Sequence, residues 1–149
     1  MRVAAALVFT AFVVMPAGAA LSVEDQFKQF DLFGHWAVDC SQPAAPANPH
    51  VSITMPSEGV VLEEHDLGTD SDRNFYSVQA AARVSQTRLS VEVIFQPGGQ
   101  GSERQKLMFV VRKGTRRTMF NQPEGGEVRV KDGVVLAAGI KTPVLRKCD

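Results

Sequence analysis

Hydrophobic and polar side chains alternate along much of the chain beyond residue 50, which is the period-two pattern of half-buried β-strands. The clearest run extends from Tyr76 to Val84. One face of this strand would carry Tyr76, Val78, Ala80, Ala82 and Val84. After a turn at Ser85–Thr87 the alternation resumes from Leu89 to Phe95. The two runs predict a β-hairpin with one buried face and one more polar face.

Similar short runs recur before and after this hairpin, separated by turns rather than by helices. Lys113-Gly114 and Asp132-Gly133 are typical of tight hairpin turns. The other expected strands are Trp36–Cys40, Val51–Met55, Val60–Leu67, Lys106–Arg112, Thr115–Asn121, Val128–Val130, Val134–Ala137 and Val144–Cys148. Such a series of short strands without intervening helices predicts an all-β fold, either an antiparallel barrel or a β-sandwich.

A short helix is predicted before the first strand. Ser22 can cap the free amide of Asp25, and acidic residues favour the positive end of a helix. An apolar stripe follows at helical spacing, formed by Val23, Phe27 and Phe30. Gly34 is a natural stop. We therefore expect a leading helix over residues 22–33, whose stripe packs into a core rather than into a membrane.

The first twenty residues have the features of a secretory signal peptide. Arg2 provides a positive start, and the run from Val3 to Met15 is almost continuously apolar. Small residues at Ala17–Ala20 are what signal peptidase requires near its cleavage site. The apolar run is shorter than the roughly 20 residues that span a bilayer, which favours cleavage over a membrane anchor. We expect residues 1–20 to be removed, leaving a single periplasmic or secreted domain over residues 21–149 without a stable membrane span.

Cys40 and Cys148 are the only cysteines in the chain. In an oxidising compartment such a pair normally forms a disulfide, and only one intramolecular pairing is available. A loop of roughly a hundred residues closed by this bond corresponds to about 4–5 kcal/mol of stabilisation in the chain-entropy account. A redox-active pair is the alternative, but such pairs usually have the spacing C-x-x-C.

The tripeptide Gly34-His35-Trp36 follows the predicted helix and resembles the G-x-W signature of lipocalin-like (calycin) barrels. The resemblance implies an antiparallel eight-stranded up-and-down barrel, closed at one end by Gly34 and Trp36, with Arg146 stacked on the indole ring. The chain is also similar in plan to small secreted metalloprotease-inhibitor barrels of bacteria, which act through an N-terminal segment. The β-sandwich is the alternative architecture.

The barrel interior is the first place where a ligand could bind. The strand pattern places Tyr76, Phe95 and Phe109 on apolar faces, with Trp36 at the base. In an open barrel these aromatic side chains would line a pocket, whereas in a filled barrel they are core residues. Because the chain is short and rich in Val and Ala, we expect a filled interior and keep the open one as the alternative.

Two segments have opposite charge. Residues 58–72 contain six acidic residues and no Lys or Arg, and residues 104–117 contain six basic residues. We expect both to be solvated, the basic one as a hairpin tip that discourages edge pairing. The alternatives are a Ca²⁺ loop formed by Asp66, Asp70 and Asp72, a basic contact with an anionic surface or partner, or the two segments facing each other.

Composition and motifs limit the function classes. The 149 residues are 44% hydrophobic and 21% charged, and sixteen basic residues balance sixteen acidic ones, which argues against nucleic-acid binding. His35, His50 and His65 lack the short spacing typical of metal sites, so we expect no metal and no cofactor. No catalytic motif occurs, and a hydrolase would need one histidine beside a serine and a carboxylate.

These observations predict a secreted, periplasmic, non-enzymatic β-barrel that binds a small apolar ligand or an envelope protein. The alternative is a protease-inhibitor or protein-interaction module that acts through loops or the N-terminal segment. In the first case the interior of the barrel is the site, and in the second case its surface is.

Overall fold

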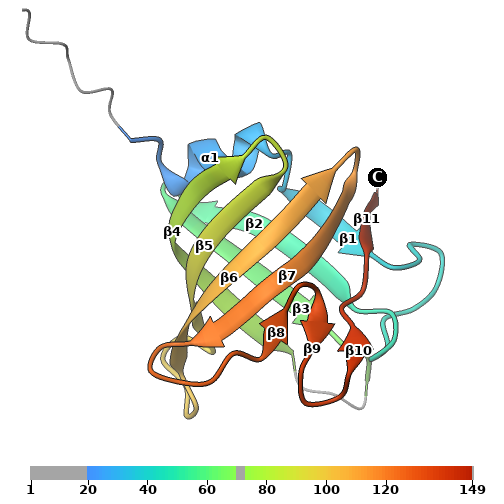
Figure 1. Ribbon diagram of the computed structural model, residues 1–149. Coiled ribbons are helices and arrows are strands. Elements are labelled where there is room, and N and C mark those ends of the chain that lie inside the picture. Colours follow the sequence, from blue (N-terminus) through green and yellow to red (C-terminus); the bar gives the residue numbers. More distant parts are fainter. Residues whose placement is uncertain (1–19, 70–72, 149) are drawn as a thin grey trace, which may run out of the picture.

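The computed structural model describes residues 20–69 and 73–148, so the predicted leader lies outside the described residues except for residue 20. The described chain has one short helix followed by eleven strands (Figure 1). The elements are α1 (Val23–Gln29), β1 (Gly34–Ala37), β2 (His50–Ser57), β3 (Val60–Asp66), β4 (Asn74–Ser85), β5 (Arg88–Phe95), β6 (Glu103–Arg112), β7 (Thr115–Pro123), β8 (Val130–Lys131), β9 (Val134–Val135), β10 (Ile140–Lys141) and β11 (Leu145–Cys148). None of the described helical residues form a segment long and apolar enough to cross a membrane.

Eight of the strands close into an antiparallel barrel. Each strand from β1 to β7 pairs with the next one along the chain, and β11 pairs with both β7 and β1. The sheet of the barrel therefore closes on itself, which confirms the predicted barrel and excludes the β-sandwich. Strands β8, β9 and β10 form a small extension beside β7, attached through the pair Asn121–Val130 (Figure 1).

Tight turns fix the hairpins as the sequence predicts. Both central residues of the Lys113-Gly114 turn have positive φ, 44° and 73°, and those of Asp132-Gly133 have 50° and 72°. These are the angles of type I′ turns, whose twist matches that of the flanking strands. The first strand lies at Gly34–Ala37 rather than at the predicted Trp36–Cys40, because the chain leaves the barrel after Ala37.

The start of the leading helix agrees with its prediction. The hydroxyl of Ser22 accepts a hydrogen bond from the amide of Asp25 at 3.1 Å, as expected for an N-cap. The helix ends at Gln29 and not at residue 33. Gly34, the predicted stop, instead opens β1 with a φ of 118°.

A Schellman motif explains the early end of α1. Asp31 has a left-handed φ of 51°, and its amide donates to the carbonyl of Lys28 at 3.0 Å. The amide of Leu32 donates to the carbonyl of Phe27 at 2.9 Å. Phe27 and Leu32 are both fully buried, which fits the hydrophobic contact that accompanies this motif. An aspartate therefore takes the role that the sequence analysis gave to a glycine.

Helix α1 covers one end of the barrel (Figure 1). Its buried side chains belong to the hydrophobic core at that end. Phe27 and Phe30 belong to the same core cluster as Trp36, which confirms that the helical stripe packs into a protein core. The indole N–H of Trp36 donates to the carbonyl of Leu32 at 2.8 Å. The closed end is thus a packed plug that ties the helix to the first strand.

The cation over Trp36 is Lys147 and not Arg146. The ammonium nitrogen of Lys147 lies 5.7 Å from the centroid of the indole ring and donates to the carbonyl of Asp31 at 3.0 Å. Trp36 faces Lys147 directly in the β1–β11 register, so the two side chains share a face. Arg146, as the neighbouring residue on the strand, points to the other face and is exposed.

The predicted alternation of β4 is wrong beyond Val78. A bulge between Val78 and Ala80 changes the face that each later residue occupies. Three residues expected on the buried face are exposed, namely Ala80, Ala82 and Val84. Ala81 packs against the core instead, and the guanidinium of Arg83 lies 5.2 Å from the ring centroid of Phe30 in α1.

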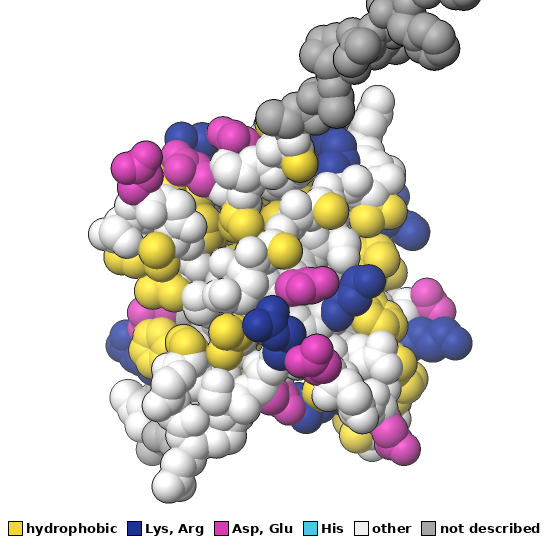
Figure 2. All heavy atoms as spheres, turned by 90° about the vertical axis from the view of Figure 1, so that its left-hand side faces the viewer, with side chains coloured by type: hydrophobic (Ala, Val, Ile, Leu, Met, Phe, Trp, Pro, Cys, Tyr) yellow, Lys and Arg dark blue, Asp and Glu magenta, His cyan; other side chains and the backbone are white. Residues whose placement is uncertain are grey.

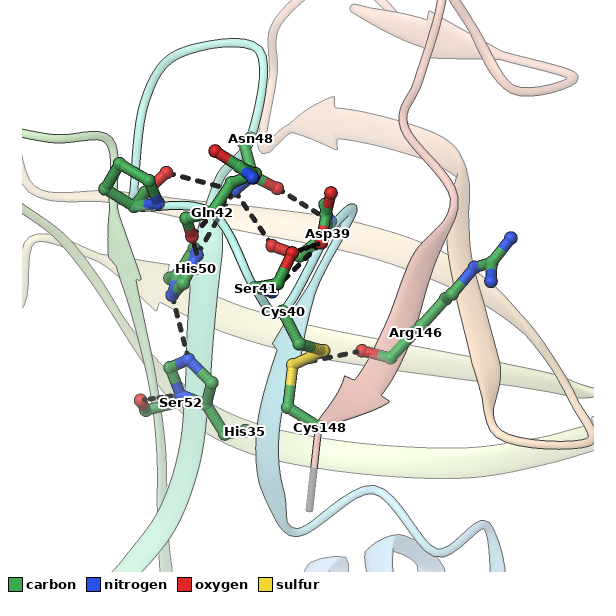
Figure 3. The surroundings of a disulfide bond; sticks show 11 residues. His35, Asp39, Cys40, Ser41, Gln42, Asn48, His50, Ser52, Arg146 and Cys148 are labelled. Carbon is green, nitrogen blue, oxygen red and sulfur yellow. Dashed lines mark hydrogen bonds between the residues drawn. A yellow bond between two sulfur atoms is a disulfide. The ribbon is translucent and has the colours of Figure 1, made fainter.

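The predicted disulfide is present between Cys40 and Cys148 (Figure 3). The two Cα atoms are 5.7 Å apart, within the usual range for disulfides, and the bond joins residues 108 positions apart. It links the segment that follows β1 to the end of β11. The covalent bond therefore clamps the seam at which the two ends of the barrel sheet meet.

The outer surface over β4 and β5 does not carry a continuous patch of one charge. Hydrophobic side chains are scattered there among polar ones, and acidic and basic side chains lie side by side (Figure 2). One ion pair that involves the basic segment joins Arg104 to Glu124, with 3.8 Å between nitrogen and oxygen.

Candidate functional site

The half of the barrel away from α1 is hollow. It contains a cavity of about 330 Å³, near the lower end of the range of about 300–1,000 Å³ for small-molecule sites. Its apolar wall is formed by Pro46, Pro49, Val51, Leu67, Val93, Leu107, Phe109, Val130, Pro143 and Leu145. The interior is thus filled at one end and open at the other, so each of the two alternatives describes one half of the barrel.

Two of the four predicted lumen residues reach this cavity. Tyr76 and Phe109 line it. Trp36 lies in the plug at the closed end, and Phe95 packs against Tyr76 with 5.2 Å between ring centroids. Phe95 and Trp36 therefore support the wall and the base of the cavity without forming its surface.

An ion pair crosses the lumen between two opposite strands of the barrel. Glu63 comes from β3 and Arg116 from β7, which are four strands apart in the closed ring. The two nitrogens Nη2 and Nη1 of Arg116 donate to Oε1 and Oε2 of Glu63 at 2.6 and 3.1 Å. Both side chains are almost fully buried, so this bidentate pair forms a polar rung inside the barrel.

Two further contacts hold this rung in place. The guanidinium carbon of Arg116 lies 4.4 Å from the ring centroid of Phe109, a cation–π arrangement. The ring nitrogen Nε2 of His65 lies 2.6 Å from Oε1 of Glu63, and it must donate because a carboxylate only accepts. All four side chains line the cavity. The cavity thus has a polar group held rigidly among apolar walls.

Glu63 is ionised at neutral pH. Burial alone would raise the pKa of its carboxyl group, but the charge of Arg116 and the hydrogen bond and charge of His65 outweigh burial and lower the pKa to about 2. The predicted acidic and basic segments therefore face each other through Glu63 and Arg116. These two residues are buried, which corrects the expectation that both segments are solvated throughout.

Asn121 lines the cavity beside this rung and belongs to a second polar network. Its side-chain Nδ2 donates to Oε1 of Gln105 at 2.8 Å, and Gln105 Nε2 donates to Glu103 at 2.6 Å. Oδ1 of Asn121 is buried and has no hydrogen-bond partner. Sequence reasoning missed Asn121, Glu63 and Arg116 as interior residues.

Tyr76 supplies a hydroxyl group to the cavity wall. Its ring packs against His65 with 4.8 Å between ring centroids. Burial raises the pKa of Tyr76 to about 12, and the charges of Glu63 and Glu103 add to this effect. The phenol is therefore protonated at neutral pH and can donate a hydrogen bond.

The small β8–β10 extension forms part of the cavity mouth. Arg117 fastens it to β7, because its Nε donates to the hydroxyl of Thr142 at 3.1 Å and its Nη2 donates to the carbonyl of Gly133 at 2.6 Å. The hydroxyl of Thr142 in turn donates to the carbonyl of Thr118 in β7 at 2.7 Å. Thr142 and Arg117 both line the cavity, so the extension is fixed where a ligand would enter.

Two histidines form a separate hydrogen-bonded chain on β1 and β2 (Figure 3). Nδ1 of His35 lies 3.1 Å from the hydroxyl of Ser52, and its Nε2 lies 3.0 Å from Nδ1 of His50. His50 Nε2 donates to the carbonyl of Gln42 at 2.9 Å. Because that carbonyl only accepts, neutral His50 accepts from His35, and His35 accepts from Ser52.

This chain ends on a backbone carbonyl rather than on a carboxylate. In the hydrogen bonds of the described residues, His65 pairs with Glu63 and no serine joins them. No group of three or more metal-ligating side chains was found among residues 20–69 and 73–148. Of the suggested Ca²⁺ ligands, Asp70 and Asp72 lie outside the described residues, and Asp66 accepts from the amide of Gly68.

No family model, curated protein or solved structure matches this chain. The candidate site is therefore defined by its own geometry, namely a partly apolar cavity crossed by a buried ion pair at the open end of a closed barrel.

Proposed function

We propose that this protein is an exported, non-enzymatic binding protein that holds a small, largely apolar molecule in the lumen of its barrel. The observation that carries the proposal is the cavity of about 330 Å³ in the half of the barrel away from α1. Apolar walls with a few fixed polar groups are typical of small-molecule sites. Val93, Leu107 and Phe109 supply the apolar surface, and the Glu63–Arg116 rung supplies the fixed polar group.

The cavity is enclosed by elements that hold one another in place. Its walls are strands of a closed sheet, and the rung from β3 to β7 joins opposite sides of that sheet. A ligand would therefore bind without ordering new segments, which reduces the entropic cost of association. This rigidity favours a small ligand in the lumen over a function that depends on rearrangement.

Export is the second part of the proposal. A disulfide between Cys40 and Cys148 is consistent with an oxidising, extracytoplasmic compartment. The signal-like sequence of residues 1–20 supports the periplasm or the exterior as its location. The closed eight-stranded barrel and Gly34-His35-Trp36 support a lipocalin-like relationship.

The alternative of an inhibitory N-terminal segment receives less support from the packing. Phe27, Phe30 and Leu32 are all buried in the core at the closed end, and Trp36 bonds to the backbone of Leu32. A segment that must enter the cleft of a protease would have to leave this plug first. We therefore favour the lumen over the helix as the site of action.

Native mass spectrometry of the protein purified from the periplasm tests the proposal. We expect a chain that lacks residues 1–20 and retains a non-covalent small molecule. Val93→Phe, which points a larger ring into the cavity, should abolish the bound mass. Ile94→Phe, on the opposite face of the same strand, is the matched control and should retain it.

The chain offers two intrinsic probes for the same experiment, since it has one Tyr and one Trp. A ligand in the lumen should change the fluorescence of Tyr76 and leave the emission of buried Trp36 almost unchanged, because Trp36 lies in the plug. A protein that carries no small molecule and behaves identically after Val93→Phe would contradict the proposal.

A further inference from the structure

We infer that the lumen selects a neutral, mainly apolar molecule that bears a hydroxyl or amide N–H group, and that Asn121 accepts a hydrogen bond from this group. The inference rests on the proposed function, because it names the chemical class of ligand for the same cavity. Two independent observations lead to it, the pairing of Glu63 with Arg116 and one buried acceptor without a partner.

The two buried charges of the rung, on Arg116 and Glu63, compensate each other. Arg116 and Glu63 are joined by two hydrogen bonds and are both nearly inaccessible to solvent. An anionic ligand would bring a second negative charge close to Glu63, and a cationic ligand would face Arg116 in the same way. Beside this pair either ion would lose its hydration without gaining an unpaired counter-charge, so a neutral molecule is favoured there.

Arg117 at the mouth uses two of its nitrogens to bind neutral acceptors. Arg117 donates to the hydroxyl of Thr142 and to the carbonyl of Gly133, and these bonds hold the β8–β10 extension against β7. An anion that recruited Arg117 would have to compete with both acceptors. Arg117 keeps its charge, but recruiting its Nε and Nη2 donors to an anion would release the β8–β10 extension from β7, which disfavours an anionic ligand.

The polar network behind Asn121 determines which end of its amide is unpaired. Glu103 accepts from both Arg129 and Gln105, and a carboxylate cannot donate, so Nε2 of Gln105 must face Glu103. Oε1 of Gln105 then faces Asn121, whose Nδ2 donates to it at 2.8 Å. This order leaves Oδ1 of Asn121 as the free acceptor, in agreement with its lack of any partner.

An unpaired buried acceptor is costly, because it has lost its hydrogen bonds to water without gaining others. A ligand that donates a hydrogen bond to Oδ1 of Asn121 would remove this cost, whereas a ligand without a donor would leave it in place. A site of this kind discriminates against analogues that lack the hydroxyl or N–H group. Asn121 is thus assigned as the residue that recognises the hydroxyl or N–H group of the ligand.

Four probes with the same eight-carbon chain test this assignment by calorimetry on the exported, disulfide-bonded protein at pH 7. The probes are 1-octanol, octyl methyl ether, octanoate and octylammonium. We expect 1-octanol to bind most tightly, by a factor of about five or more over the ether, as one hydrogen bond of about 1 kcal/mol implies. Asn121→Leu should remove the difference between 1-octanol and the ether.

The matched control is Gln122→Leu, on the neighbouring position of β7, which should leave the ranking unchanged because Gln122 bonds to the carbonyl of Gly126 instead. Tighter binding of octanoate or octylammonium would overturn the inference while leaving lumen binding intact. Equal binding of 1-octanol and the ether, or no binding of any probe, would also overturn it. The proposed function is decided separately, by the retained mass and the Val93→Phe variant.

Discussion

Glu63 and Arg116 show how strongly one buried side chain depends on another. A single charge in the interior would lose most of its hydration, and only its partner and further hydrogen bonds compensate for that loss. Here Glu63 accepts from Arg116 and from His65, and Arg116 also lies over the ring of Phe109. The rung joins β3 to β7 across the lumen. The two side chains therefore meet only when the strands of the barrel are in their observed register.

We expect Glu63→Gln to lower the free energy of unfolding by about 3–5 kcal/mol, because it leaves the charge of Arg116 buried without a counter-charge. The double variant Glu63→Gln with Arg116→Met should recover most of the loss, since it removes the unpaired charge. Glu64→Gln is the matched control. Glu64 pairs with the exposed Arg73, and a surface pair contributes at most about 1 kcal/mol. Urea denaturation measures the free energy of unfolding of all three variants.

Equal urea midpoints for Glu63→Gln and Glu64→Gln would contradict the rung as a buried pair. A double variant as unstable as Glu63→Gln would show that the cost arises from lost packing and not from charge.

The same carboxyl group predicts how stability changes with acid. The pKa of Glu63 is about 2 in the folded protein and near its ordinary value of 4.5 in the unfolded chain. The folded state therefore binds fewer protons, so the pairing contributes fully above pH 4.5, and its contribution falls as the pH is lowered from 4.5 towards 2. Urea denaturation at several pH values should show this decline.

The double variant Glu63→Gln with Arg116→Met provides the comparison for this acid series. It should show a smaller decline between pH 4.5 and 2, because it lacks the titrating group. Parallel pH profiles for the two proteins would count against the lowered pKa of Glu63.

The sequence could not place Glu63 inside the barrel. In β3 both alternating sets of residues begin with an apolar side chain, Val60 and Leu62 on one face and Val61 on the other. The polar residues that follow fall on both faces, so the pattern does not indicate which of Glu63 and Glu64 points inward. Glu63 is placed inside only by the closed barrel, in which β3 lies across the lumen from β7 and Glu63 meets Arg116.

At the level of elements, local chemistry predicted turns and caps better than strand faces. The cap at Ser22 and the type I′ turn at Asp132-Gly133 depend on a few adjacent residues, and both are confirmed. The bulge after Val78 depends on how β4 pairs with β5, which alternation does not reveal. The early end of α1 also required Asp31 to adopt a left-handed conformation, which glycine adopts far more easily.

Gly133 connects turn geometry to the mouth of the cavity. Its φ is 72°, and a Cβ atom added there would lie 2.8 Å from Nη2 of Arg117. Gly133→Ala should therefore cost about 1–2 kcal/mol in backbone strain, plus about 1 kcal/mol for each Arg117 hydrogen bond that is displaced. Gly59→Ala is the control, because Gly59 has a φ of 74° with nothing within 4 Å of an added Cβ. Urea denaturation of the two variants measures the difference between their free energies of unfolding.

The effect of Gly133→Ala should also be local. Hydrogen exchange of amides in the β8–β10 extension should increase in Gly133→Ala and not in Gly59→Ala, because Arg117 fastens this extension to β7. Identical stabilities and exchange rates for the two variants would show that Arg117 does not hold the extension.

For the whole molecule, closure of the sheet determines both the site and its stability. The sequence predicted most strands and the number of barrel strands, but the hollow half depends on how much of the interior α1 fills. That filling is set by where Phe27, Phe30 and Leu32 enter the barrel. No pattern along the chain gives the depth of this plug, so alternation alone leaves the filled and the open interior as two alternatives.

The seam at β11 is where closure is most easily lost. Strand β11 pairs with β7 through only two residue pairs, Leu145–Arg116 and Arg146–Thr115, and it pairs with β1 through three. The disulfide of Cys148 with Cys40 holds this short strand in place (Figure 3). Since Arg116 belongs to one of the β7 pairs, the seam also supports the polar rung.

We expect Cys40→Ala with Cys148→Ala to lower the free energy of unfolding by about 4–5 kcal/mol, because the bond closes a loop of 108 residues in the unfolded chain. Amides of β11 should lose protection from hydrogen exchange before those of β5 and β6, which pair with each other through eight residue pairs in the middle of the sheet. The reduced wild-type protein is the control and should match the double variant, which reductant should not change further. If the double variant kept the urea midpoint of the oxidised protein, the remaining strand pairs and the core plug would suffice to close the barrel, and the seam would not need its covalent clamp.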